Sequence, residues 1–161
     1  SERNLARIEA WRNACPDITI RSTFIVGFPG ETEDDHAELL GFLDAVRLDW
    51  AGFFAFSPED GTAAAGLGGE VDGATAAERL RECSEVQDPI TAAARQALVG
   101  TGVEVLVDRS GPEGSVGRTH REAPEIDGVV RMTGATVPAG STVLARVTGA
   151  VGPDLEAEVV A

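Results

Sequence analysis

The stretch Ile18–Thr32, ITIRSTFIVGFPGET, constrains the fold of this chain more than any other. An apolar run that ends in a Gly-Phe-Pro-Gly turn is typical of a buried parallel strand that feeds a helix. Thr32 begins a T-x-x-D pattern with Asp35, which predicts a capping box at the start of that helix. A second apolar run, Trp50–Phe56, follows the helix. The order predicts a βαβ unit with two parallel strands.

Two parallel strands with helices outside them do not cover both faces of a sheet, although parallel sheets are normally buried on both sides. Together with a first helix, Ser1–Ala14, residues 1–61 are therefore predicted to be the last βαβ part of a larger α/β domain, such as a partial β/α barrel. The glycine-rich stretch Thr62–Gly73 predicts a mobile connection. A long helix from Ala74 to about Leu98 follows, and Pro89 is expected to kink or split it.

After Gly100 the hydrophobic period changes from 3.6 to 2, which is the period of strands. Turn residues separate five short candidate strands, namely Val103–Val107, Ser115–Arg118, Gly128–Met132, Thr142–Thr148 and Leu155–Val160. Five short strands in so few residues are typical of a small barrel of the OB type. The predicted fold class is thus an α/β fragment followed by a small all-β barrel.

The charge of the chain bears on its partners. Its 161 residues carry a net charge of −14, and its cations are all arginines. An acidic surface repels nucleic-acid phosphates and suits a basic protein partner, although it also serves simple solubility. The two cysteines, Cys15 and Cys83, lack metal-site spacing and are both expected to be buried. With no leader or spanning segment visible, the chain is expected to be cytoplasmic.

The turn Gly27–Thr32 is the strongest candidate binding motif. It is not a phosphate-binding P-loop, because it has no lysine, and the acids that follow it would repel a phosphate. One interpretation is a flat, neutral or cationic ligand packed on Ile25–Phe28, and the other is a tight turn with a good helix cap. At the end of the second strand, the ligand candidates are Phe56, Ser57 and Glu59, whereas Phe53 and Phe54 are expected in the core.

A second candidate segment is the loop Arg118–Asp127, RTHREAPEID, which mixes cations and acids between two predicted strands. Such a loop is either a recognition loop on a rigid scaffold or simply a solvated one. His120 has no nucleophile nearby in the sequence, and His36 is not expected to be catalytic. No catalytic triad, metal-ligand cluster or basic patch is apparent. No catalytic or metal-ligating residue is therefore predicted in this chain.

Four segments, RSTFIVGFPGETEDD, FFAFSPEDGT, EVLVDRSG and GRTHREAPEIDGVV, occur in this order. Together they resemble the carboxyl-terminal part of the radical-SAM methylthiotransferases. The resemblance implies that residues 1–97 are the end of the radical-SAM β/α barrel with a connecting helix, and that residues 98–161 are a TRAM β-barrel. The stretch APEIDG at Ala123–Gly128 is similar to the RimO-type branch, which modifies an aspartate of a small-subunit ribosomal protein (S-twelve).

The resemblance also implies the chemistry of the intact enzyme. One 4Fe-4S cluster would reduce S-adenosylmethionine to a radical that takes hydrogen from the β-carbon of the aspartate, and a second would supply sulfur. The cluster motif CxxxCxxC is absent here, so this chain alone is predicted to be inactive. The implied adenosyl-binding residues are Ile25, Val26, Gly27, Phe28, Phe56 and Ser57. The implied contacts with a basic ribosomal protein are Arg118, His120, Arg121, Glu125 and Asp127.

Three alternatives stay open at this point. The first is the transfer-RNA branch of the same family, which a positive face on the barrel would favour. The second is a non-catalytic binding module of the TRAM type. The third is an unrelated α/β fragment in which the Gly27–Thr32 turn is merely structural.

Overall fold

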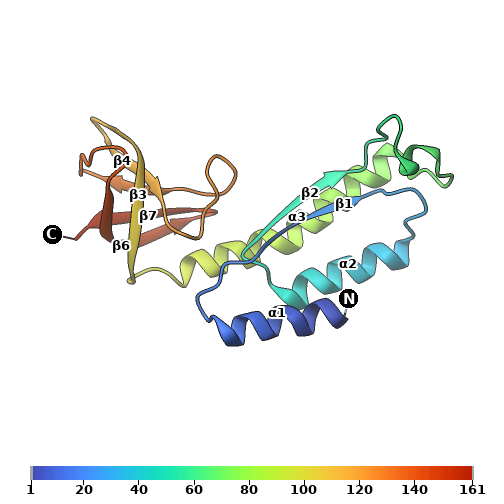
Figure 1. The fold of residues 1–161 in the computed structure, drawn as a ribbon, viewed down its shortest axis with the longest axis horizontal. Coiled ribbons are helices and arrows are strands. Elements are labelled where there is room, and N and C mark those ends of the chain that lie inside the picture. The colour runs from blue at the N-terminus through green and yellow to red at the C-terminus, as the bar shows by residue number, and fades with distance from the viewer. Residues whose placement is uncertain (1, 161) are drawn as a thin grey trace. The chain divides into compact units, whose positions relative to one another are not determined.

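The computed structural model describes residues 2–160 and shows three main helices, one short helix and two sets of strands (Figure 1). The first set of elements is α1 (Glu2–Ala14), β1 (Arg21–Val26), α2 (Glu33–Val46), β2 (Trp50–Ala55), the 3₁₀ helix η1 (Ala63–Gly66) and α3 (Gly73–Gln96). The second set is β3 (Gly102–Gly111), β4 (Gly114–Arg118), β5 (Val130–Thr133), β6 (Thr142–Val151) and β7 (Asp154–Val159). One compact unit runs as far as Ile90 and a second begins at Thr91.

The first unit is built on the predicted βαβ crossover. Strands β1 and β2 pair in parallel, with Arg21 opposite Trp50 and Val26 opposite Ala55. The side chains of Val26, Leu43 and Cys83, from β1, α2 and α3, form a core with no solvent exposure. Helices α2 and α3 therefore cover the same face of the strand pair.

The two ends of α2 are satisfied by side chains, as the sequence predicts for its start. Thr32 Oγ1 accepts a hydrogen bond from Asp35 N, and Thr32 N donates to Asp35 Oδ2 at 2.9 Å, which completes the capping box. The Thr32 hydroxyl donates to the same carboxylate and lowers the pKa of Asp35. At the other end, Arg12 of α1 donates to the Val46 carbonyl at 2.6 Å. A cation at a helix carboxyl end is favoured by the helix dipole.

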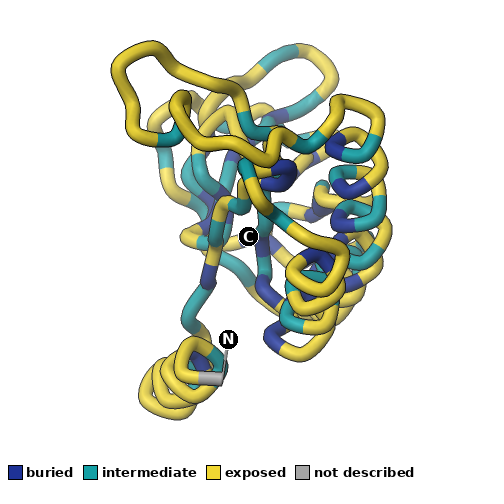
Figure 2. Tube along the Cα trace, turned by 90° about the vertical axis from the view of Figure 1, so that its right-hand side faces the viewer, coloured by how far each residue is buried: buried dark blue, intermediate teal, exposed yellow. Residues whose placement is uncertain are grey.

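The second face of the strand pair is open. Ile25 and Phe54 are opposite each other in the register, and their exposed fractions are 56% and 60%. The expectation that Phe54 lies in the core is therefore wrong: its side chain is on the face that α2 and α3 do not cover. Most of α1 is exposed as well (Figure 2). The incomplete sheet predicted from the sequence is what the structure shows.

Helix α3 runs unbroken through Pro89, so this residue does not split it. Proline removes the hydrogen bond to the carbonyl of the residue four positions earlier, which is Glu85. Both Pro89 and Glu85 are on the exposed side of the helix, where water can satisfy that carbonyl.

Among the described residues, no helix is long and apolar enough to cross a membrane.

The second unit is a closed five-stranded barrel, in the order β3-β4-β5-β7-β6. All neighbouring strands are antiparallel except β5 and β7, which run parallel. Alternate residues point inward, as the period-2 pattern predicts. The interior consists of Val105, Val107, Val130, Met132, Ala145, Val147, Leu155 and Ala157. The fold class predicted from the sequence is confirmed in both parts.

Gly128, the last residue of the APEIDG stretch, allows a close approach of two backbone segments. A Cβ at this position would lie 2.0 Å from the carbonyl oxygen of Pro153, in the turn between β6 and β7. Real Cβ contacts are never this short, so a larger residue would push the two segments apart. Gly111 is a matched contrast, since a Cβ there would meet nothing within 4 Å.

We expect Gly128→Ala to lower the free energy of unfolding of the barrel by roughly 1–3 kcal/mol, the usual cost of overpacking. Gly111→Ala should leave it almost unchanged. Both Trp11 and Trp50 lie in the first unit, so urea unfolding of the barrel has to be followed by far-UV circular dichroism. Equal midpoints for the two variants would contradict the prediction.

The two cysteines have different environments. Cys83 is fully buried in α3, as predicted, whereas Cys15 is exposed just after α1, so the expectation that both are buried is wrong. Pro16 and Asp17 end the first helix at this point, and no neighbouring element covers the thiol. Burial raises the pKa of the Cys83 thiol to about 11, and the charges of Glu31 and Glu82 add to the shift.

At pH 8 the native chain should therefore be alkylated by iodoacetamide at Cys15 and not at Cys83, because only the thiolate reacts and Cys83 is also inaccessible. In denaturant both residues should react. Peptide mass spectrometry after a short exposure distinguishes the two sites. Labelling of Cys83 in the native chain at the rate of Cys15 would show that α3 is not packed as described.

Candidate functional site

The turn that follows β1 is shaped by glycines and by contact with α3. Gly27 and Gly30 have left-handed backbone conformations, with φ of 72° and 87°. A Cβ at Gly27 would lie 2.9 Å from the Ala76 side chain of α3, so glycine is needed for this helix to pack on the turn. Gly30 N donates to the Gly69 carbonyl at 2.8 Å. We call residues 25–31 the βα turn.

Glu31 of the βα turn and Glu33 at the start of α2 are both paired with one arginine, which sequence reasoning did not foresee. Arg79 of α3 donates to Glu31 Oε1 at 2.8 Å and to Glu33 Oε1 at 2.5 Å. Phe28 N donates to the other oxygen of Glu31 at 3.2 Å. Burial works against the charge of Arg79, but its bonds to Glu33 and Glu31 outweigh this and raise its pKa. Arg79 and Glu31 together hold the backbone of the turn.

The predicted adenosyl-binding residues divide into two groups. Ile25 and Phe28 expose 56% and 41% of their surface, and Phe28 contacts Phe56 edge-on with ring centroids 5.1 Å apart. The Val26 side chain is instead buried beneath the sheet, and its carbonyl accepts from Phe56 N at 2.8 Å.

A cavity of about 310 Å³ lies beside the βα turn, and Gly27 and Phe56 help to line it together with η1 and the start of α3. Ser57 is exposed and does not line this cavity. Ala55, Phe56 and Pro58, at the carboxyl end of β2 and just after it, line this cavity, whereas Ile25 and Phe28 do not. A mainly apolar lining of this kind is suited to a flat ring system.

The barrel loop between β4 and β5 is anchored by a buried ion pair. We call residues 119–128 the barrel loop. Arg95 of α3 donates to Glu122, whose side chain has no exposure. The second oxygen of Glu122 accepts from Thr119 N at 2.6 Å and from the Thr119 hydroxyl at 2.8 Å. Glu122 therefore serves the structure of the loop, because a buried carboxylate needs such partners.

Asp127 also has a structural role. Its carboxylate accepts from Ala123 N at 2.7 Å, and its own N–H donates to the Ala123 carbonyl at 3.3 Å. Glu125 takes the left-handed conformation at the tip, with φ of 62°. Between these two residues, Ile126 exposes 73% of its surface. The loop thus presents an apolar side chain beside an acid on a rigid turn.

The remaining predicted partner residues lie around this turn. Arg118 forms an ion pair with Asp108 across β3 and β4. His120 is exposed and Arg121 is half-buried. The sequence shows Ile126 as an apolar residue among acids in this loop, but it was not among the residues predicted to contact a partner; the structure places it exposed at the tip.

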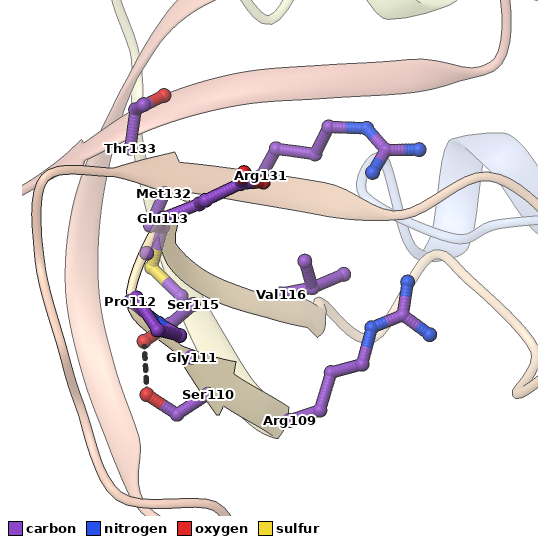
Figure 3. A pocket seen from close by; sticks show the side chains of 11 residues that line it. Arg109, Ser110, Gly111, Pro112, Glu113, Ser115, Val116, Arg131, Met132 and Thr133 are labelled. Atoms are coloured by element: carbon purple, nitrogen blue, oxygen red, sulfur yellow. Dashed lines mark hydrogen bonds between the residues drawn. The ribbon is translucent and has the colours of Figure 1, made fainter.

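A second cavity, of about 570 Å³, lies on the barrel between the β3–β4 hairpin and β5 (Figure 3). Arg109, Val116 and Arg131 are opposite one another in the strand register and form one row. Arg131 donates to Asp154 at 2.8 Å, whereas Arg109 makes no ion pair with any residue among 2–160. The period-2 pattern could have placed these two arginines on one face. Two guanidinium groups flanking a valine suit an anion.

Within the described residues, no group of His, Cys, Asp and Glu side chains could hold a metal ion. The chain thus offers an apolar pocket beside a fixed turn, an anchored barrel loop and a short arginine row.

Comparison with known proteins gives the family. Residues 99–160 match the TRAM domain. The chain is 49% identical over 156 residues to ribosomal protein uS12 methylthiotransferase RimO of Methylobacillus flagellatus, covering 96% of this chain and 35% of the relative. The protein of that name from Moorella thermoacetica is 51% identical over 144 residues, 89% of this chain and 32% of the relative. The protein of that name from Ralstonia pickettii is 43% identical over 164 residues, which cover 99% of this chain and 36% of the relative.

The chain therefore spans about a third of the length of the curated relatives it matches. The match runs through both units, from the βα turn to the barrel, so it is not confined to the TRAM domain. These findings confirm the resemblance seen in the sequence: the chain corresponds to the TRAM-containing carboxyl-terminal part of the RimO-type methylthiotransferases.

Proposed function

We propose that this chain is the carboxyl-terminal part of an enzyme that methylthiolates the β-carbon of an aspartate in ribosomal protein uS12. The observation that carries the proposal is the match of nearly the whole chain to proteins named for this activity, at 43% to 51% identity. In the proposal, S-adenosylmethionine and two 4Fe-4S clusters supply the radical chemistry and the sulfur. The cluster ligands belong to parts of the enzyme outside this sequence. The proposal places the enzyme in the cytoplasm.

The role proposed for the first unit is to bind the adenosyl group. Ile25 and Phe28 offer apolar surface, Gly27 allows close approach of the backbone, and Phe56 lines the cavity beside them. These groups fit a flat ring through packing and backbone hydrogen bonds. Val26 would contribute to adenosyl binding through its backbone alone, and Ser57 would contact the ligand from the edge of the site. Because this chain supplies no metal ligand in the proposal, its residues bind and orient, and they exclude water from the open face.

The role proposed for the barrel loop is to dock the protein substrate. Ile126 would enter an apolar depression of the partner, and Glu125 beside it would meet a basic residue. The net charge of −14 supports a basic protein as the partner. Arg118, His120 and Arg121 would lie at the edge of the contact, and Asp127 would hold the loop in shape.

A transfer RNA remains the second candidate substrate, since the row of Arg109 and Arg131 gives the barrel one local positive face. RNA binding through this row would weaken steeply with salt. The two substrates are distinguished directly by offering both to the same enzyme.

The intact enzyme, reconstituted under reducing, oxygen-free conditions with S-adenosylmethionine, should add one methylthio group to uS12 and none to transfer RNA. Mass spectrometry of the digested protein locates the modified aspartate, and nucleoside analysis of the RNA provides the second readout. Modification of the RNA alone would overturn the proposed substrate. No modification of either, with clusters verified by absorbance, would overturn the proposed activity.

We expect Ile126→Ser to raise the dissociation constant of the intact enzyme for uS12 roughly ten-fold or more, since burying an isoleucine contributes about 1.5–3 kcal/mol. Leu144→Ser is the matched control, because Leu144 is 54% exposed near the start of β6, at the end of that strand away from the turn that contacts Gly128. Isothermal titration calorimetry measures both. If the two variants bind equally well, the barrel loop is not the docking site.

A further inference from the structure

Helix α3 carries two arginines whose side chains are each only 4% exposed, Arg79 and Arg95. Arginine is rarely buried unless it is paired. Each of them pairs with a glutamate, Glu31 in the βα turn and Glu122 in the barrel loop. One helix thus holds both segments to which the proposed function gives a role.

The Arg79 pair reaches the part of the turn that would face the adenosyl group. One oxygen of Glu31 accepts from Arg79, and the other accepts from Phe28 N at 3.2 Å. Two hydrogen bonds through Glu31 therefore link the backbone N–H of Phe28, whose ring is exposed, to the buried guanidinium group of Arg79. A shift of Glu31 would release the backbone N–H of Phe28 and with it the part of the turn that presents the Phe28 ring.

The energetics of burial also favour a positioning role. The Arg79 Nε lies buried with no hydrogen-bond partner among the described residues. Replacing a buried ion pair by apolar groups is often neutral or stabilising, so stability alone does not require this arginine. What the pair does supply is a fixed direction for the turn, because the guanidinium group holds Glu31 and Glu33 at the same time.

The Arg95 pair reaches the barrel loop in the same manner. One oxygen of Glu122 accepts from Arg95, and the other accepts from the backbone and hydroxyl of Thr119. This fixes the start of the loop whose tip presents Ile126. Arg95 belongs to the second unit and Arg79 to the first, so each pair acts inside its own unit.

We propose that Arg79 and Arg95 are positioning residues of the enzyme: Arg79, through Glu31, sets the turn that binds the adenosyl group, and Arg95, through Glu122, sets the loop that binds the protein substrate. The proposal rests on the proposed function. It predicts that substitutions of the two arginines have separate effects, because Arg79 affects the binding of the adenosyl group only and Arg95 affects the binding of the protein substrate only.

The test uses the intact enzyme and measures two constants for every variant, the dissociation constant for S-adenosylmethionine and that for uS12. Arg79→Met should raise the first constant about ten-fold, the scale seen for supporting residues behind binding groups, and leave the second unchanged. Arg95→Met should raise the dissociation constant for uS12 about ten-fold and leave that for S-adenosylmethionine unchanged. Arg81→Met is the control: Arg81 lies two positions from Arg79, is 52% exposed and, among residues 2–160, pairs with Glu78 and Glu85 of its own helix.

If an arginine has only a structural role, its substitution would lower the melting temperature and would either raise both dissociation constants together or change neither of them. Either result would overturn the proposal. If a methionine variant does not fold, Arg79→Lys and Glu122→Gln decide, since they keep the volume of the side chain and remove only the fork or the charge. Failure of the unsubstituted enzyme to bind S-adenosylmethionine or uS12 would instead overturn the proposed function, which the same measurements reveal first.

Discussion

The first unit depends on a constraint of parallel sheets, which need cover on both faces. Helices α2 and α3 cover one face of β1 and β2, where Val26, Leu43 and Cys83 are fully buried. The other face leaves Ile25 and Phe54 largely exposed. Apolar surface of this kind costs about 25 cal/mol for each Å² left in water. The first unit therefore leaves one face of β1 and β2 uncovered, and the βα turn follows β1 at the end of this strand pair.

The sequence predicted what local pattern controls. The strand before Gly27, the capping box of Thr32 and Asp35, and the alternation of the barrel strands all follow from neighbours within a few residues. It did not predict the pairs that hold the two candidate segments. Arg79 and Glu31 are 48 positions apart, and Arg95 and Glu122 are 27 apart. No periodic pattern relates residues this far apart in the sequence, so these ion pairs are visible only in the folded structure.

The barrel loop shows how a run of charges divides into different roles. Glu122 is buried with Arg95, and Asp127 accepts from the backbone of Ala123, so both maintain the loop. Glu125 and Ile126 are left at the surface. Composition alone treats the three acids as equivalent. Burial separates them, because a carboxylate inside a protein must be fully hydrogen-bonded, whereas one at a turn tip is free to meet a partner.

The arginine row on the barrel is a weaker guide to a partner than it first looks. A nucleic-acid surface gains affinity with each phosphate that it neutralises. Here the charge of Arg131 is already met by Asp154, which leaves Arg109 as the one cation of the row without an ion pair in residues 2–160. Glu156 is opposite Arg131 on β7 and continues the same row with an acid. With Asp154 and Glu156 counted, the two arginines leave this row without net positive charge, which gives little attraction for RNA. The exposed Ile126 is therefore the stronger feature, and it favours a protein.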